Sequence, residues 1–214
     1  MENTQDISQG SLEWHALRLG KITASRIADV MATIKTGEAA SRADYRMQLV
    51  CERLNNKREE GYTNQYMANG IELEPFARAW YEVERNVFVR QEAFMQHPTL
   101  SFCGASPDGI VEEDDELGLI EIKCPKATTH AKTMLEDRAP TKYMPQMQFQ
   151  MACSGAKWVD FVSYCPEFPL DLQLFIKRVY RDDEYIKEVE SKAVEFNDEV
   201  ETTIQRLKGN KNGS

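Results

Sequence analysis

An acid-rich stretch in the middle of the chain carries the residue types of a divalent-cation site. Asp108 follows Pro107, and Glu121 lies 13 positions later with Lys123 two residues beyond it. Residues 119–123 alternate apolar and charged side chains, which is typical of a strand, so Glu121 and Lys123 share one face. The acidic segment 112–118 is typical of a hairpin loop, and a hairpin would bring Asp108 beside Glu121. Two carboxylates and an ammonium that converge suit a hard divalent cation and an activated water.

The patterns around this motif predict one α/β (α+β) domain, with a central mixed β-sheet flanked by helices. We expect residues 1–209 to form this single domain and residues 210–214 to be a flexible C-terminal tail. Periodicity and end signals predict helices over 11–18, 26–31, 39–55, 64–85, 143–154 and 182–208. Strands are expected to begin at 87–89 and to cover 100–105, 119–123, 158–164 and 170–180, with 110–111 continuing the second strand past the Pro-Asp-Gly turn.

The helix predicted over 64–85 carries a stripe of large apolar side chains. Its members are Met67, Ile71, Phe76, Trp80 and Val83. Such a stripe would face the core of the domain. Gly70 and Pro75 interrupt the segment, so a break or kink in this helix is expected.

Composition is that of a globular protein, with 42% hydrophobic and 29% charged residues in 214. No apolar run approaches the roughly 20 residues of a membrane span, and the N-terminus lacks the features of a signal peptide. We therefore expect a cytoplasmic protein with no membrane partner. The five cysteines are widely spaced and none forms Cys-x-x-Cys, which predicts free thiols in place of a zinc or iron–sulfur site.

Charge is distributed unevenly along the chain. The net charge of -9 argues against a protein that coats DNA unspecifically. Residues 14–58 nevertheless carry nine Lys and Arg against four Asp and Glu, whereas 182–214 carry nine acids against five bases. A basic front and an acidic back could be a footprint for nucleic acid, and ordinary helix surfaces are the alternative.

Four short blocks in the same order resemble the phage lambda exonuclease family of viral recombination nucleases, within the restriction-endonuclease-like superfamily of the Pro-Asp…Glu-x-Lys motif. They are Trp-His-x-Leu-Arg-Leu-Gly-x-Ile-Thr-Ala-Ser from Trp14, Ser-Pro-Asp-Gly from Ser106, Glu-Ile-Lys-Cys-Pro from Glu121 and Tyr-Met-x-Gln-x-Gln from Tyr143. The resemblance implies a Mg²⁺-dependent enzyme that digests double-stranded DNA from the 5′ end, releasing mononucleotides and leaving a 3′ single strand. It also implies a homotrimeric ring, a single-strand annealing protein as partner, and a phage or prophage origin in a bacterial cell.

The metal ligands implied by this resemblance are Asp108, Glu121 and the backbone carbonyl of Ile122. Glu74, in preference to Glu72, would hold a second metal or a metal-bound water. One or two Mg²⁺ ions are expected, with Mn²⁺ able to replace them. Mg²⁺ is usually bound by one or two carboxylates together with waters and substrate phosphate.

Two further catalytic residues are expected. Lys123 would act either as the base that takes a proton from the attacking water or as a stabiliser of transition-state charge. Gln148 would hydrogen-bond the water or the scissile phosphate, and Gln146 would point elsewhere.

Arg18, Thr23 and Ser25 resemble a pocket for the terminal 5′ phosphate, with Ser106 joining them from beside the metal site. A guanidinium fork matches a phosphate, and Thr23 and Ser25 stand at a predicted helix start, where free N–H groups favour an anion. Plain helix capping is the structural alternative for these two residues. A pocket of this kind would explain 5′ polarity.

One position departs from the family pattern, because Thr129 stands where an arginine follows the catalytic lysine by six residues. Lys126, His130 or Lys132 would have to rebuild any DNA contact there. Two other functions remain open at this stage. They are an endonuclease or DNA-repair nuclease with the same core, and a catalytically inactive DNA-binding module.

Overall fold

The computed structural model describes residues 7–59 and 65–209, with the side chains of 65–69 left out. The tail predicted at 210–214 therefore lies outside the described residues. The helices and strands follow one another in this order, with η for a 3₁₀ helix: α1 (Leu12–Arg18), β1 (Ile22–Thr23), η2 (Ala24–Arg26), α2 (Ile27–Val30), α3 (Ala40–Asn55), α4 (Gln65–Arg85), β2 (Met95–Gln96), β3 (Cys103–Ala105), β4 (Gly109–Glu113), β5 (Glu116–Lys123), α5 (Ala127–Glu136), η3 (Thr141–Tyr143), α6 (Met144–Ser154), β6 (Trp158–Tyr164), η4 (Leu170–Leu172), β7 (Leu174–Tyr180) and α7 (Asp183–Gly209).

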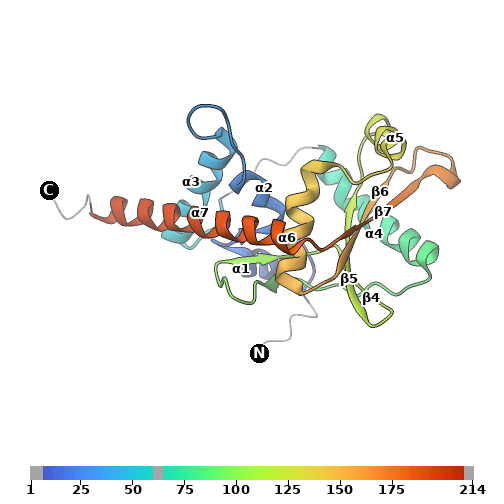
Figure 1. The fold of residues 1–214 in the computed structure, drawn as a ribbon, viewed down its shortest axis with the longest axis horizontal. Helices are drawn as coiled ribbons and strands as arrows, with labels where there is room; N and C mark the ends of the chain where they lie inside the picture. Colours follow the sequence, from blue (N-terminus) through green and yellow to red (C-terminus); the bar gives the residue numbers. More distant parts are fainter. Residues whose placement is uncertain (1–6, 60–64, 210–214) are drawn as a thin grey trace.

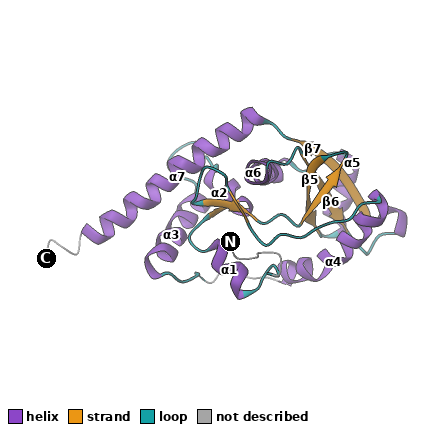
Figure 2. Ribbon diagram, turned by 90° about the horizontal axis from the view of Figure 1, so that it is seen from below, coloured by secondary structure: helices purple, strands orange, loops and turns teal. Residues whose placement is uncertain are grey.

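The strands form two sheets in place of the single central sheet that was expected. β1, β3 and β2 make a small sheet in that order, and β4, β5, β6 and β7 make a larger one. The larger sheet is mixed, because the β5–β6 pair is parallel while the β4–β5 and β6–β7 pairs are antiparallel. Helix α6 runs between the two sheets, and α7 extends to one side, packed on α3 and α6 (Figures 1 and 2). The predicted α/β class, with mixed strands flanked by helices, is confirmed.

The β4–β5 hairpin confirms the pairing predicted from the acidic motif. Gly109 pairs with Ile120, so Asp108 falls opposite Glu121. The strands are longer than expected and leave a turn at Asp114 and Asp115, both with positive φ. Asp tolerates this left-handed conformation better than most residues. The hairpin is thus a local feature that the strand pattern predicts well.

Helix α4 packs against the larger sheet with a different face from the one predicted. Ala77 and Tyr81 are buried against the sheet, whereas Phe76 and Val83 are 62% and 75% exposed. The helix also continues through Pro75 without a break. The apolar stripe therefore did not mark the buried face of α4. The side chains that pack on the sheet are instead a small one, Ala77, and one with a polar tip, Tyr81.

Helix α5 was not predicted from the sequence. Its sequence is rich in threonine, and its N-cap Lys126 offers no capping side chain. Its buried anchor is His130, whose ring nitrogens contact Ser163 Oγ at 2.8 Å and the Leu172 carbonyl at 2.9 Å. Tertiary hydrogen bonds therefore support a helix that local propensity does not indicate.

The basic and acidic ends of the chain meet where α3 packs on α7. Arg42 and Arg46 both pair with Glu199, and Arg53 pairs with Glu201. A large part of the uneven charge in the sequence is therefore neutralised inside the fold. The alternative of ordinary helix surfaces holds for these arginines.

Two further features concern membrane-spanning helices and cysteines. No helix within 7–59 or 65–209 combines the length and apolarity needed to cross a bilayer. All five cysteines lie in the described part of the chain and are free thiols.

Candidate active site

Asp108 and the β5 strand form one edge of the candidate active site. Asp108 Oδ2 accepts a hydrogen bond from the Ile122 amide at 2.7 Å. The N–H and C=O of one strand residue face the same edge, so the Ile122 carbonyl also faces Asp108. The structure thereby brings together the three groups that the resemblance implied as metal ligands, Asp108, Glu121 and the Ile122 carbonyl.

Glu121 points into the protein, toward α6, and is only 1% exposed. Its carboxylate accepts hydrogen bonds from Lys123 Nζ, from Gln146 Nε2 at 2.7 Å and from Gln150 Nε2 at 2.6 Å. Both oxygens of this buried carboxylate therefore have hydrogen-bond donors. The polar face of β5 is therefore a buried, hydrogen-bonded surface and not a solvated one.

Glu74 reaches the site from α4, whereas Glu72 is exposed. Arg78, one turn later, donates to Glu74 Oε1 and also to the backbone carbonyl of Asp108 at 3.1 Å. Burial raises the pKa of Glu74; the Arg78 guanidinium lowers it and the Glu121 charge raises it again. The structure thus places Glu74, and not Glu72, beside Asp108.

The carboxylates at this site repel one another. Burial raises the pKa of Asp108 well above its usual range, and the charges of Glu121 and Glu74 raise it further. A divalent cation bound among these groups would remove that repulsion. The donor set is all oxygen, which is what Mg²⁺ prefers.

Within the residues the structure describes, no three His, Cys, Asp or Glu side chains lie close enough to form a metal site by themselves. Two carboxylates and a carbonyl are nevertheless sufficient for Mg²⁺, which keeps several waters and takes substrate phosphate. The residues present therefore fit the ion that the resemblance implied. Asp108, Glu121 and Ile122 would hold it, with Glu74 nearby.

Lys123 lies between the carboxylates and Tyr143, with Nζ 5.2 Å from the ring centroid. Burial alone would lower the pKa of Lys123, but the charges of Glu121 and Asp108 outweigh it and raise the pKa above its usual value. The side chain is therefore an ammonium in this arrangement. An ammonium suits charge stabilisation, and action as a base would first require loss of the proton.

Gln148 does not belong to this site, contrary to the sequence-based expectation. Its Nε2 donates to the Tyr180 carbonyl at 2.9 Å, and its Oε1 accepts from the Asp182 amide at 2.9 Å. It ties α6 to the start of α7. The prediction that Gln146 points away from the site was also wrong, since Gln146 contacts Glu121.

Sequence reasoning missed Gln150 and Arg78. Each stands four residues after another site residue, Gln146 and Glu74 respectively, so each pair shares one helix face. That spacing is a signal the sequence contains. Gln150 is fully buried, and its Oε1 has no hydrogen-bond partner in the described residues, which leaves an acceptor for a water.

The four residues of the predicted phosphate pocket do come together. Arg18 donates to Ser106 Oγ at 2.9 Å and to Ser25 Oγ at 3.1 Å, and the Thr23 and Ser25 hydroxyls are 3.3 Å apart. The Arg18 guanidinium stacks 4.1 Å from the Trp14 ring centroid, and Trp14 Nε1 also donates to Ser106. Arg18, Thr23 and Ser25 line a cavity of about 290 Å³.

Charge in this cavity is positive and incompletely neutralised. Burial lowers the pKa of Arg18 to about 10, and the nearby Arg58 lowers it as well. No carboxylate among the described residues forms an ion pair with Arg18. Arg58 itself contacts His15 Nε2 at 2.9 Å. A half-buried cation without an acid partner is suited to binding an anion.

The helix-start argument for Thr23 and Ser25 is weaker in the structure than in the sequence. These residues enter η2, a three-residue 3₁₀ turn, and the Thr23 amide already donates to Tyr45 Oη at 3.2 Å. Neither side chain makes the capping bond that was the alternative. Anion binding would therefore depend on the side chains of Arg18, Ser25 and Ser106.

The replacements considered for the family arginine at Thr129 can now be separated. His130 is fully buried and bonded on both ring nitrogens, so it cannot reach DNA. Lys126 is exposed, and the Lys132 side chain is 76% exposed. Of the three replacements considered, the two lysines lie at the surface.

Comparison with known proteins shows which proteins this chain is similar to. Residues 13–157 match the YqaJ-like viral recombinase domain. An alkaline exonuclease from Laribacter hongkongensis is similar over 94% of this chain and 97% of its own, with 45% identity and a TM-score of 0.84. The same exonuclease in complex with dAMP gives 46% identity and a TM-score of 0.86 over equal shares.

A phage-related exonuclease from Haemophilus somnus shares the fold, with a TM-score of 0.69 at 14% identity over 87% of this chain and 96% of its own. The search of curated proteins found no match. The matched family segment covers more than half of the chain and includes Arg18, Glu74 and the Asp108–Lys123 hairpin. The chain belongs to the YqaJ-like viral recombinase family and is a nuclease of that family.

Proposed function

We propose that this protein is a Mg²⁺-dependent exonuclease that digests double-stranded DNA from the 5′ end. The observation that carries the proposal is the connection between the two sites. Ser106 accepts a hydrogen bond from Arg18 and stands two residues before Asp108. A terminal phosphate bound by Arg18 would lie on one side of the carboxylates, so that the adjoining phosphodiester reaches them.

The residues of the site have distinct roles in this proposal. When bound, Mg²⁺ would polarise the scissile phosphate and activate a water. Gln146 and Gln150 hold the Glu121 carboxylate in place. Lys123, as an ammonium, orients the phosphate and stabilises the negative charge that develops on it.

Polarity and product follow from the same arrangement. Hydrolysis between the first and second nucleotides releases a 5′ mononucleotide and leaves a new 5′ phosphate on the strand. Binding of that phosphate by Arg18 would draw the duplex forward by one nucleotide. The relative that was crystallised with dAMP supports a mononucleotide product.

One experiment separates this function from the alternatives. Linear and circular duplexes are incubated with Mg²⁺ and the products are followed. Mononucleotides from linear DNA alone support the exonuclease, whereas nicked circles would support an endonuclease. Binding without cleavage would support an inactive DNA-binding module, although the intact Asp108, Glu121 and Lys123 set argues against it.

Arg18→Ala tests the polarity directly. The variant should lose the preference for 5′-phosphorylated over 5′-hydroxyl ends, because it removes the guanidinium that faces the pocket. Arg206→Ala, near the end of α7, is a control cation remote from both sites. If Arg18→Ala keeps the full preference, the terminal phosphate is bound elsewhere.

We also propose a homotrimeric ring and a single-strand annealing partner, as the resemblance implies. Phe76, Trp80 and Val83 lie on one face of α4 and are 62%, 38% and 75% exposed, which offers an apolar surface for a second copy. Sedimentation equilibrium should give the mass of a trimer. A monomer at all concentrations would overturn the ring.

A further inference from the structure

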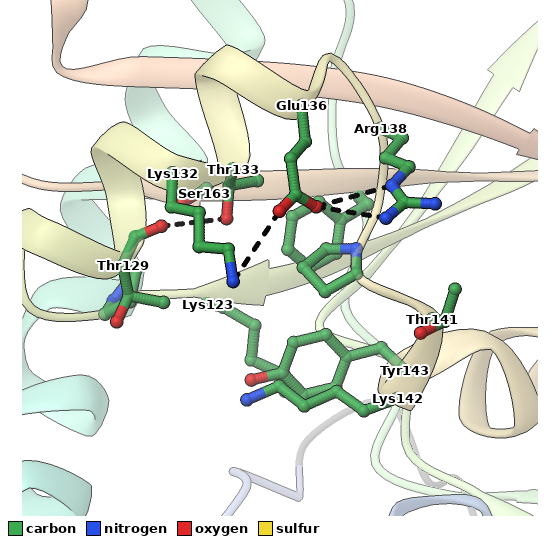
Figure 3. Close-up of a pocket in the computed structure, with 13 residues that line it drawn as sticks. Lys123, Thr129, Lys132, Thr133, Glu136, Arg138, Thr141, Lys142, Tyr143 and Ser163 are labelled. Carbon is green, nitrogen blue, oxygen red and sulfur yellow. Dashed lines mark hydrogen bonds and ion pairs between the residues drawn. The ribbon is translucent and has the colours of Figure 1, made fainter.

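A second basic cavity adjoins the catalytic lysine on the side away from Arg18. It lies between α5, η3 and the ends of β5 and β6, and has a volume of about 360 Å³. We call it the α5 cavity and define it by Lys123, Lys132, Glu136, Arg138, Lys142 and Tyr143, which line it. Figure 3 shows Lys132, Glu136 and Arg138 along one side and Lys142 and Tyr143 along the other.

The charge of the α5 cavity is positive in a protein whose net charge is -9. Glu136 is the one acid in its lining and is shared by Lys132 at 3.7 Å and Arg138 at 3.3 Å. Lys142 has no carboxylate partner among the described residues, and its ammonium lies 4.7 Å from the Tyr143 ring centroid. Two cations share one acid and a third has none, so the cavity is under-neutralised.

The α5 cavity is continuous with the catalytic centre through Lys123. The stem of this lysine lines the cavity while its ammonium contacts Glu121. Tyr143, stacked on Phe161 with centroids 5.6 Å apart, forms an apolar floor beside it. A cationic rim over an aromatic floor suits the alternating phosphates and sugars of a nucleic-acid strand.

The position of the α5 cavity relative to the Arg18 pocket indicates which part of the strand it would hold. The two cavities have no lining residue in common. Helices α1 and α5 lie on different sides of β5 in both views (Figures 1 and 2). If the terminal phosphate is bound by Arg18 and the scissile phosphate faces Asp108, the strand continues toward Lys123 and α5.

We propose that the α5 cavity binds the backbone phosphate of the cleaved strand that is next on the 3′ side of the scissile phosphate. This rests on the proposed 5′-to-3′ exonuclease function. Lys142 and Arg138 are its principal contacts, and Glu136 opposes binding.

The test is a thermodynamic cycle that combines one change in the protein with one change in the DNA. Affinities are measured without Mg²⁺ so that the duplex stays intact. One 5′-phosphorylated duplex has ordinary phosphates, and a second has a neutral methylphosphonate at the proposed position. Lys142→Ala should weaken binding of the ordinary duplex about two- to fivefold, the range of an exposed ion pair. It should also reduce the slope of log affinity against log salt by about one.

With the methylphosphonate duplex, the difference between the wild type and Lys142→Ala should disappear, because the charge that Lys142 contacts is gone. Glu136→Gln should instead tighten binding of the ordinary duplex about two- to fivefold, by removing the competing acid. Lys142 and Glu136 are surface residues, so both variants should fold. Lys192→Ala, an exposed cation on α7, should change neither affinity nor slope.

The proposal for the α5 cavity is overturned if the effect of Lys142→Ala persists with the methylphosphonate at that position. It is likewise overturned if the effect disappears only when the complementary strand carries the neutral linkage. Mononucleotide release by the wild type from the ordinary duplex with Mg²⁺ is scored separately. Absence of that release overturns the proposed function, whereas the binding measurements test only whether the α5 cavity binds the phosphate.

Discussion

The three glutamines of α6 provide the sharpest test of the site geometry. Gln146 and Gln150 donate to Glu121 at 2.7 and 2.6 Å, whereas Gln148 donates to the Tyr180 carbonyl on the other side of the helix. The same substitution, Gln to Leu, at the three positions should therefore separate catalysis from stability. The prediction compares variants with matched chemistry in one helix.

Gln150→Leu should act on the catalytic centre. A hydrogen bond to a charged group contributes about 1.5–3 kcal/mol, and its loss leaves Oε2 of the buried Glu121 side chain without the Gln150 donor. Loss of a partner that orients a metal ligand typically reduces metal affinity or activity about 10- to 100-fold. We expect a change of that size in the Mg²⁺ concentration for half-maximal rate, in the maximal rate, or in both, and a similar change for Gln146→Leu.

Gln148→Leu should act on stability instead. Two neutral hydrogen bonds are lost, and the Tyr180 carbonyl and Asp182 amide are left without their partner, for a total of about 2–4 kcal/mol in the free energy of unfolding. Its Mg²⁺ dependence should match the wild type. Urea unfolding and initial rates against Mg²⁺ measure the two effects. The reverse outcome, with Gln148→Leu losing Mg²⁺ activation and the other two keeping it, would refute the orientation of α6.

Three further outcomes follow from the structure. Lys123→Ala should lose cleavage yet still bind duplex DNA, and near-normal turnover would remove Lys123 from the mechanism. Because burial raises the folded-state pKa of Asp108, its contribution to stability is present below the usual Asp pKa and is lost as pH rises through the raised value. Because Mg²⁺ binds the ionised carboxylate, activation by Mg²⁺ should strengthen with rising pH. In EDTA at neutral pH, Asp108→Asn should have a higher melting temperature than the wild type. Equal melting temperatures would contradict the unfavourable charge inferred at Asp108. Asp160→Ala should lower the free energy of unfolding by about 3–5 kcal/mol, because it removes a fully buried carboxylate from Arg178, Arg85 and Tyr81. Chemical unfolding measures this loss, and a loss below about 1 kcal/mol would mean that the network contributes little.

The sequence alone was a sound guide to the hairpin and its motif. Period-two alternation predicted that Glu121 and Lys123 share a face, and the structure buries Ile120 and Ile122 on the opposite face. Strand faces are decided by neighbours one or two residues away, so local pattern is sufficient. The joining of Arg18 to Ser106 is different, because it spans 88 residues and was expected only from the resemblance.

Helix faces and charge partners required the tertiary structure. Helix periodicity sets Gln146 and Gln150 on one face and Gln148 on nearly the opposite one, but the face that meets β5 depends on how α6 lies between the two sheets. Helix α5 and the cavity beside it could not be predicted from the sequence for a related reason. His130 is held by Ser163 and Leu172, which lie in a distant strand and a distant turn. The arginines of the basic segment 14–58 likewise came to differ in their charge partners only on folding. Arg42, Arg46 and Arg53 are neutralised by α7, and Arg18 is left facing the pocket. The sequence by itself thus determined the local strand geometry of the catalytic motif, whereas packing over long sequence separations decided which side chains surround it.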